Sequence, residues 1–344
     1  MPTVELDPSI APVEVEGFRF PLGVYPIEPL TPTPGYVEEF EQADGGPTFW
    51  TDDGPAGDDW EEWPDRFMYD IVLSADRMPT LMRAFLSLLP AHVYPILDVL
   101  GNDAYREVDP YIAYEPVGVD RVFDALRSFG PWLYEDGLVG FGAMSLEPFC
   151  YAFVDEHKIL TVRVEPELKE RAERALGAFG LTAVGEIRGA DAAAHEHRGV
   201  LVHPSDTQPN VMTAEEIVDR LRRHWNLQLN IDRTTNLDDD GTDLGRTYWR
   251  GLIRCIEDED GPELFAEVVL IALSLDEAVS IAGEATMKDA GRGRGVFQVE
   301  PLSFDRLTPE GCAEVLGEDP PRSGAESKVL RLRWLGQDEP SSAS

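Results

Sequence analysis

The chain has 344 residues, of which 65 are Asp or Glu and 29 are Lys or Arg, so its formal net charge is −36. Such a charge repels phosphate backbones and anionic headgroups, which argues against direct nucleic-acid backbone binding and against a membrane-surface protein. The hydrophobic share of 43% is enough for ordinary buried cores, so global disorder is excluded. The length suits two ordinary domains, or one large domain with tails.

Cysteine usage and the N-terminal sequence together indicate the cytoplasm. Cys150, Cys255 and Cys312 are far apart and show no C-x-x-C spacing, which argues against a disulfide framework or a zinc site. The first residues lack the basic and apolar regions of a signal peptide, and no apolar run is long enough to span a bilayer. We therefore expect a cytoplasmic protein that does not associate with membranes.

Residues 1–64 differ from the rest of the chain, with fifteen acidic residues, one basic residue and eleven prolines. This composition is typical of a largely extended or disordered arm. Aromatic residues recur along it, and two interpretations stay open. The aromatics dock on the protein's own surface, where buried rings contribute strongly to packing, or the acidic end of the arm binds a basic protein partner. The candidate partner-binding residues are Trp50, Trp60 and Trp63.

Residues 65–188 alternate strand and helix patterns, which predicts an α+β domain. The turn from Asp155 to Lys158 joins two apolar runs and predicts a β-hairpin with a solvated tip. Residues 91–100 are ambiguous between an edge strand and a short helix, because Pro95 interrupts them. Predicted strands are 67–73, 138–144, 149–154 and 159–164, and predicted helices are 78–89, 119–130 and 166–179.

Residues 189–212 look like a connector in which His195 and His197 are surface residues. Thr213 and Glu216 have the spacing of a capping box, which predicts that a helix begins there and opens a second α+β subdomain over residues 213–335. Predicted strands in this subdomain are 227–231, 246–256, 263–273 and 328–334, and predicted helices start at 213, 274 and 308. Residues 336–344 read as a disordered polar tail. The expected fold is therefore α+β, with mixed or antiparallel sheets and packed helices in two α/β-sandwich-like subdomains behind the acidic arm.

The first candidate site is a set of carboxylates, Asp103 and Asp109, that could converge with Glu156 and His157 of the hairpin turn. Carboxylates with a histidine are typical of divalent-metal and acid–base sites. The spacing matches no established motif, however, and Asp is also ordinary turn chemistry. In that alternative, Arg106 simply pairs with neighbouring acids and fixes the loop.

A second candidate is the acidic loop that begins at Asn236. Asn236, Asp238 and Asp240 stand at positions one, three and five of a calcium-type loop, and Gly241 follows them. Position twelve is Thr247 instead of the bidentate Glu, and strands instead of helices are predicted on both sides. The pattern therefore favours an acidic hairpin loop, with weak Ca²⁺ binding as the alternative.

The third candidate is a basic stripe on one predicted strand, where Arg246, Arg250 and Arg254 share a face by the two-residue period. Aligned guanidiniums can hold a phosphate or a carboxylate. The alternative is cross-strand pairing with acids such as Glu263 and Glu267 on the next strand, which antiparallel neighbours favour.

None of these patterns is a catalytic signature, so we expect a non-catalytic binding or interaction protein. Two alternatives remain: a divalent-metal-dependent hydrolase or transferase that uses Asp103, Asp109 and His157, and a small-anion sensor that uses Arg250 and Arg254. The only cofactor that the sequence indicates is a divalent cation.

Overall fold

The structure is a computed structural model of the chain, and the chain divides into two compact units. Unit 1 comprises residues 1–99 and 110–230, and unit 2 comprises residues 100–109 and 231–344. Both contain antiparallel strands and helices, so the predicted α+β class is confirmed. The described residues are 3–43, 50–51, 54–55, 64–203, 210–256, 263–290, 298–322, 324 and 326–335, with only the backbone described at 50–51 and 54–55.

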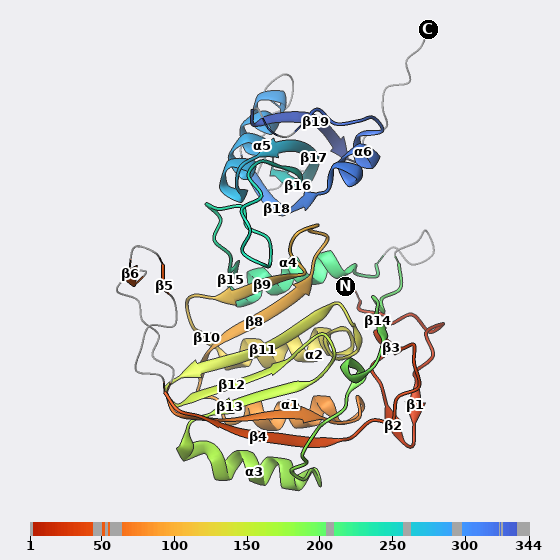
Figure 1. Cartoon of the computed structure of the whole chain (residues 1–344), viewed down its shortest axis with the longest axis vertical. Helices are drawn as coiled ribbons and strands as arrows, with labels where there is room; N and C mark the ends of the chain where they lie inside the picture. Colours follow the sequence, from red (N-terminus) through yellow and green to blue (C-terminus); the bar gives the residue numbers. More distant parts are fainter. Residues whose placement is uncertain are drawn as a thin grey trace. The chain divides into compact units, whose positions relative to one another are not determined.

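Within its described residues, unit 1 is built on one nine-stranded sheet (Figure 1). The predicted hairpin is confirmed at its centre, where Val154 pairs with Leu160 in antiparallel register. The strand order is β15 (Leu227–Leu229), β9 (Val108–Ala113), β8 (His92–Leu100), β11 (Val139–Leu146), β12 (Phe149–Val154), β13 (Leu160–Val164), β7 (Arg66–Val72) and β4 (Gly35–Glu41), and β10 (Val117–Gly118) pairs with β8.

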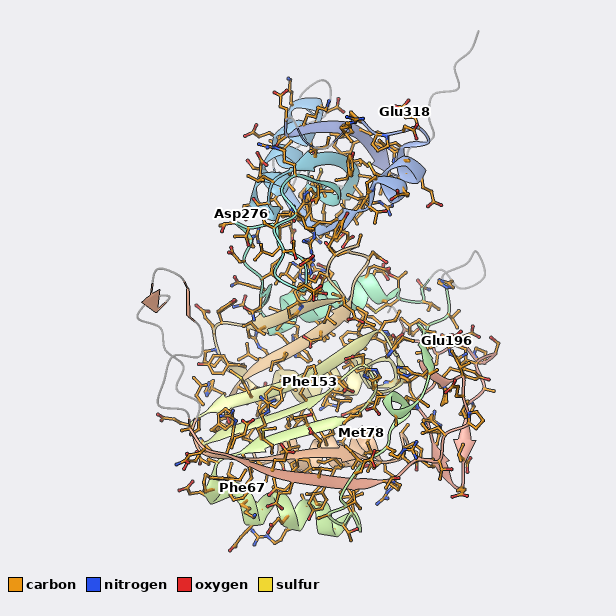
Figure 2. The ribbon with its side chains drawn as sticks, in the orientation of Figure 1. Phe67, Met78, Phe153, Glu196, Asp276 and Glu318 are labelled. Carbon is orange, nitrogen blue, oxygen red and sulfur yellow. The ribbon has the colours of Figure 1, made fainter. Side chains whose placement is uncertain are left out.

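The helices of unit 1 share one hydrophobic core with alternate residues of the sheet. Figure 1 shows α1 and α2 behind the strands, and Figure 2 marks Met78 at the start of α1. Phe85 of α1, Trp132 of α2, Leu176 of α3 and Trp225 of α4 all belong to this buried cluster. The helices are α1 (Met78–Leu86), α2 (Val119–Glu135), α3 (Lys169–Ala178), preceded by the 3₁₀ turn η1 (Pro166–Leu168), and α4 (Ala214–Trp225).

Two helix ends show how local signals and packing compete. Helix α4 begins as predicted, because the Thr213 hydroxyl accepts a hydrogen bond from the Glu216 backbone N–H at 3.3 Å. Helix α2 was predicted to end at Gly130 but continues to Glu135. Burial of Trp132 and Leu133 contributes about 1.5–3 kcal/mol for each side chain, which offsets the roughly 3 kcal/mol cost of a proline inside a helix.

Residues 3–43 fold onto unit 1, which corrects the expectation of a largely extended or disordered arm. Phe18 and Phe20 are buried, so the docking interpretation holds for these aromatics. Three short strands belong to this segment: β1 (Glu14–Val15), β2 (Phe18–Arg19) and β3 (Val24–Pro26). Strand β4 pairs with β7 at the edge of the large sheet. A strand that joins an existing sheet packs its apolar side chains on the core of that sheet and does not need a core of its own.

The structure does not describe the side chains of the three tryptophans proposed for partner binding. The backbone of Trp50 lies in β5 (Trp50–Thr51), which pairs with β6 (Gly54–Pro55). Trp60 and Trp63 fall outside the described residues. Their role stays a prediction.

The segment predicted as a connector and the start of the predicted second subdomain both contribute to unit 1. Residues 189–212 include η2 (Ala190–Ala192) and β14 (His195–His197), and β14 pairs with β3. Helix α4 packs on α2, and β15 pairs with β9 at the end of the sheet. The boundary between the units therefore falls at residue 230 instead of near 212.

Unit 2 contains a four-stranded antiparallel sheet in its described residues. Tyr248, Val269, Ile271 and Cys312 form a buried cluster that joins this sheet to α6. The strand order is β18 (Gln298–Leu307), β16 (Thr247–Ile256), β17 (Glu263–Ala272) and β19 (Lys328–Leu335), and the helices are α5 (Leu275–Ala290) and α6 (Pro309–Leu316). Residues 336–344 lie outside the description.

None of the described helices is both long enough and apolar enough to cross a membrane.

Candidate metal centre

The carboxylates first proposed as ligands are engaged in ion pairs within unit 2. Both oxygens of the buried Asp103 accept hydrogen bonds from Arg306 Nε, at 2.9 and 3.0 Å. Asp109 pairs with Arg106 at 2.5 Å, as the structural alternative expected. His157 belongs to unit 1, and no described group of three ligand atoms combines it with Asp103 or Asp109. Asp103 and Asp109 are therefore each paired with an arginine of their own unit.

Side chains of the calcium-type loop also make hydrogen bonds within the loop itself. Asn236 is buried and donates from Nδ2 to the Gly245 carbonyl at 2.6 Å. Asp238 accepts the backbone N–H groups of Asp240 and Thr242, at 3.1 and 2.7 Å. Leu237 and Asp243 form an antiparallel bridge across this loop, as in the acidic hairpin loop that the sequence favours. A pocket of about 380 Å³ lies beside it, lined by Asp103–Glu107 and Asp238–Asp240.

The arginine stripe is paired in the way that the cross-strand alternative predicted. Arg250 donates to Glu267 from Nε and Nη2, at 2.9 and 2.7 Å. Arg254 donates to Glu300 at 3.0 Å and lies 3.6 Å from Glu263. Arg246 instead donates to the Ser327 hydroxyl at 3.0 Å. These contacts make the stripe a structural network of the sheet instead of a ready anion site.

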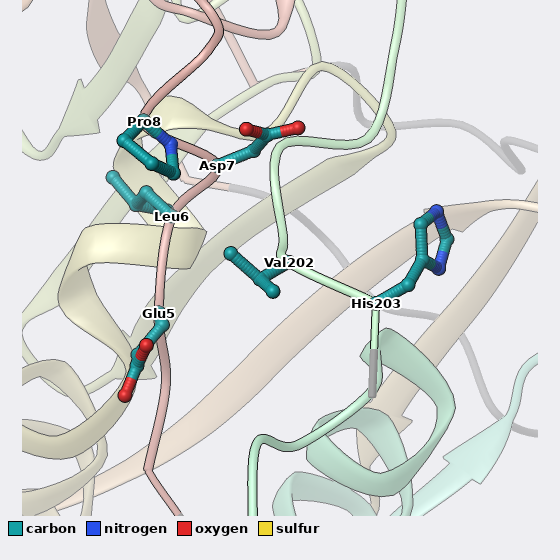
Figure 3. Close-up of a pocket in the computed structure, with 6 residues that line it drawn as sticks. All are labelled: Glu5, Leu6, Asp7, Pro8, Val202 and His203. Carbon is teal, nitrogen blue, oxygen red and sulfur yellow. The ribbon is translucent and has the colours of Figure 1, made fainter. Parts of the chain in front are cut away.

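A pocket of about 460 Å³ lies in unit 1 between two extended segments (Figure 3). The segments are held together by backbone hydrogen bonds, such as Val202 N–H to the Glu5 carbonyl at 3.0 Å. Figure 3 shows the side chains of Asp7 and His203 directed away from Glu5. The lining therefore offers no convergent set of polar groups. It consists of Glu5, Leu6, Asp7, Pro8, Val202 and His203.

Three histidines do converge in unit 1. His157 lies on the turn between β12 and β13, whereas His195 and His197 lie on β14. The two-residue period places His195 and His197 on the same side of β14. The exposed Glu196, which Figure 2 labels, lies between them in the sequence. The ring centroids are 4.7–4.9 Å apart, and the ligand atoms of all three residues lie within 4.8 Å of one another. His195 Nε2 and His197 Nε2 are 3.0 Å apart.

Each imidazole is oriented through its Nδ1 atom. His195 Nδ1 lies 2.8 Å from the Ala193 carbonyl oxygen, and His197 Nδ1 lies 2.6 Å from that of Gly137. A carbonyl oxygen only accepts hydrogen bonds, so both Nδ1 atoms carry a proton, and in the neutral form of each ring the lone pair is at Nε2. Histidines that bind metals are typically held in this way by hydrogen bonds from their other nitrogen.

The third imidazole is held by carboxylates. His157 Nδ1 lies 3.2 Å from Glu156 Oε1 and 3.8 Å from Asp155 Oδ2, which leaves Nε2 as its ligand atom. Asp155 and Glu156 raise the pKa of His157 to about 10, and the hydrogen bond with His157 lowers the pKa of Glu156 to about 2. The carboxylates thus favour positive charge at this ring.

The electrostatics of the cluster require a positive charge among the imidazoles. Two Nε2 lone pairs at 3.0 Å repel each other unless a proton or a metal ion lies between them. Burial lowers the pKa of His197, with a further contribution from the neighbouring His157. A metal ion coordinated by the Nε2 atoms would supply this positive charge.

Close backbone packing brings β14 to the sheet. A Cβ atom at Gly137 would lie 2.0 Å from the Gly23 carbonyl oxygen, so the two chains approach as closely as glycine allows. The Arg198 N–H donates to the same Gly23 oxygen at 2.9 Å. Residues 24–26 and 195–197 therefore form a ribbon whose histidines face the end of β12.

The hairpin turn is fixed by Lys158, which corrects the prediction of a solvated tip. Lys158 is only 5% exposed, has a φ of 64° and donates from Nζ to the Val139 carbonyl oxygen. Burial lowers the pKa of Lys158 to about 8. This anchor fixes the turn next to His157, whose own side chain stays partly exposed.

Sequence reasoning named His157 and Glu156 but missed His195 and His197. The available signal was the His-x-His spacing, which on a strand places both rings on one side. The surrounding alanines and acids gave no strand pattern, and the cysteine count directed attention away from zinc. The pairing of β14 with β3 is a long-range contact that one sequence does not reveal.

Comparisons of the chain with protein-family models, with curated proteins and with solved structures found no match. The geometry of the histidine cluster is therefore the evidence for its chemistry.

Proposed function

We propose that the protein binds one divalent transition-metal ion through the Nε2 atoms of His157, His195 and His197. The observation that carries this proposal is the orientation of the rings. Every Nδ1 faces an oxygen acceptor, at 2.6–3.2 Å, and the remaining nitrogens are directed at one another. A metal ion that displaces the protons from these nitrogens finds three ligand atoms already close together.

The donor atoms select the class of ion. Imidazole nitrogen suits Zn²⁺, Cu²⁺, Ni²⁺ and Co²⁺, whereas Mg²⁺ and Ca²⁺ prefer oxygen ligands. Zinc–nitrogen bonds of about 2.0–2.1 Å in a tetrahedron place the nitrogens roughly 3.3 Å apart. The distance of 3.0 Å between His195 Nε2 and His197 Nε2 is close to that value, and the ligand atoms of all three histidines lie within 4.8 Å of one another.

Metal binding without an assigned reaction agrees with the binding role expected from the sequence. A metal-dependent hydrolase is the second candidate, because catalytic zinc sites commonly have three protein ligands where structural sites have four. Its ligands would then be the three histidines instead of Asp103 and Asp109. Zinc-dependent hydrolysis of a small ester that is lost in His197→Ala would favour this second candidate.

Two expectations from the sequence are kept as separate proposals. The net charge of −36 supports a basic protein partner for the segment that carries Trp50, Trp60 and Trp63. The spacing of the cysteines, which argues against a disulfide framework, supports a cytoplasmic location.

The test is calorimetric titration of the metal-free, full-length protein with Zn²⁺, Mg²⁺ and Ca²⁺. We expect one Zn²⁺ site per chain, and no comparable binding of Mg²⁺ or Ca²⁺. His197→Ala is expected to lose the site, and His203→Ala, which removes an exposed histidine elsewhere in unit 1, is expected to keep it. Equal Zn²⁺ binding by wild type and His197→Ala would refute the proposal.

A further inference from the structure

The two carboxylates next to His157 do not belong to the same ligand set as the three imidazoles. Asp155 and Glu156 approach His157 on its Nδ1 side, at 3.8 and 3.2 Å. In the described residues, the three histidines form one group of converging ligand atoms, and Asp155, Glu156 and His157 form another. The two groups share His157 alone. The carboxylates therefore orient a ligand and are placed behind it, as in carboxylate–histidine–metal arrangements.

The other polar side chains nearby are committed elsewhere. Lys158 donates to the Val139 carbonyl oxygen. The buried Asp136 accepts the backbone N–H groups of Leu138 and Val200, each at 2.9 Å. Among the described residues, none supplies a fourth His, Cys, Asp or Glu atom to the three-histidine group. The ligands that this chain provides are therefore three imidazole nitrogens, each neutral once the ion has displaced its proton.

The cluster is accessible from solvent. The side chain of His157 is 22% exposed, and His195 and His197 are half-buried. A tetrahedral ion bound by three nitrogens has a fourth position, and an ion with only neutral ligands keeps its full charge of about +2. The positive charge of the ion attracts an anion to the fourth position. In a closed site with carboxylate ligands, the ligands would already neutralise this charge.

We infer that this site, on the premise of the proposed metal binding, is a receptor for a small exogenous anion that coordinates the ion directly. The ligand class is a monodentate anionic donor, such as a carboxylate or azide, that replaces water at the fourth position. No covalent bond of the ligand is broken, and the protein supplies the three histidines and the accessible side of the ion. Glu156 positions His157 and does not itself bind the ion.

The experiment uses the full-length protein loaded with Co²⁺, whose visible spectrum reports the number and kind of its ligands. Sodium azide is titrated into the loaded wild type, with Co²⁺ in buffer as the blank. We expect the visible bands to shift and to saturate with azide. A Co²⁺ spectrum that does not respond to azide would overturn the inference while leaving metal binding intact.

Two variants separate the possible failures. Glu156→Gln keeps the shape of the side chain and removes its charge, so it is expected to bind Co²⁺ more weakly and still respond to azide. If Glu156 occupied the fourth position, only the Gln variant would respond, which would contradict the inference. His197→Ala is expected to lose the Co²⁺ spectrum. A wild type that shows no protein-dependent Co²⁺ spectrum would refute the metal proposal itself, and the inference with it.

Discussion

Removal of one ligand histidine should strongly reduce the stabilisation of unit 1 by zinc. Apparent binding free energies of about 10–16 kcal/mol for four-ligand zinc sites correspond to roughly 3 kcal/mol per ligand, or about a hundredfold in affinity. At a zinc concentration of one hundred times the dissociation constant, the wild type gains about 2.7 kcal/mol. His197→Ala at the same zinc concentration would be only half-saturated, and the gain falls to roughly 0.4 kcal/mol by the same relation.

Thermal unfolding converts these free energies into a measurable difference. A domain of about 150–250 residues shifts by roughly 2–4 °C per kcal/mol, and unit 1 falls in this range. We expect zinc to raise the Tm of the wild type by about 5–10 °C, and that of His197→Ala by about 1–2 °C. His203→Ala is the matched control and should shift like the wild type. Equal shifts in His197→Ala and His203→Ala would refute the assignment of His197 as a ligand.

Three further predictions concern stability. Lys158→Met removes the buried charged group that donates a hydrogen bond to the Val139 carbonyl oxygen, so we expect the free energy of unfolding in urea to fall by about 1.5–3 kcal/mol. An unchanged urea midpoint would contradict this contact. Burial raises the pKa of Asp305 to about 6, whereas an unfolded Asp titrates near pH 3.9. The unfolded state therefore releases this proton at lower pH, and the stability of the wild type should fall, relative to Asp305→Asn, as the pH rises from about 4 to 6 and then level off. Two pKa units at about 1.4 kcal/mol each make the Asn variant roughly 3 kcal/mol more stable at pH 7. Equal pH profiles of the two proteins in denaturant titrations would exclude this. Arg306→Leu leaves the carboxylate of Asp103 buried without its partner and should lower the free energy of unfolding by about 3–5 kcal/mol. The double variant with Asp103→Asn should recover part of this loss, whereas fully additive losses would argue against the pair.

The elements with strong local signals were predictable from the sequence. The hairpin of residues 149–164 and the capping box at Thr213 depend on neighbours a few residues apart, and both appear in the structure. Elements that depend on distant partners were not. The strand at 92–100 contains Pro95, and its place beside β11 is fixed by pairing with a segment some forty residues away. Residues 35–41 become a strand because β7 lies next to them, which composition alone could not show.

The candidate site shows the same division. The chemistry of Glu156 and His157 was visible in the turn sequence, because local spacing brings a carboxylate to the ring beside it. The partner histidines at 195 and 197 come from a ribbon that docks through the close approach of Gly23 and Gly137. The carboxylate of Asp103 is paired with Arg306, two hundred residues away in the sequence, and no local pattern indicates this ion pair. Charge and residue type thus indicate candidates, and tertiary contacts decide which of them converge.

The most direct test of the metal site is the position of the ion in crystals of the zinc-soaked, full-length protein, located by anomalous diffraction at the zinc edge. The account predicts one strong anomalous peak, about 2.0–2.1 Å from the Nε2 atoms of His157, His195 and His197. A peak on Asp155 and Glu156 without the imidazoles, or no peak at the cluster at saturating zinc, would contradict it.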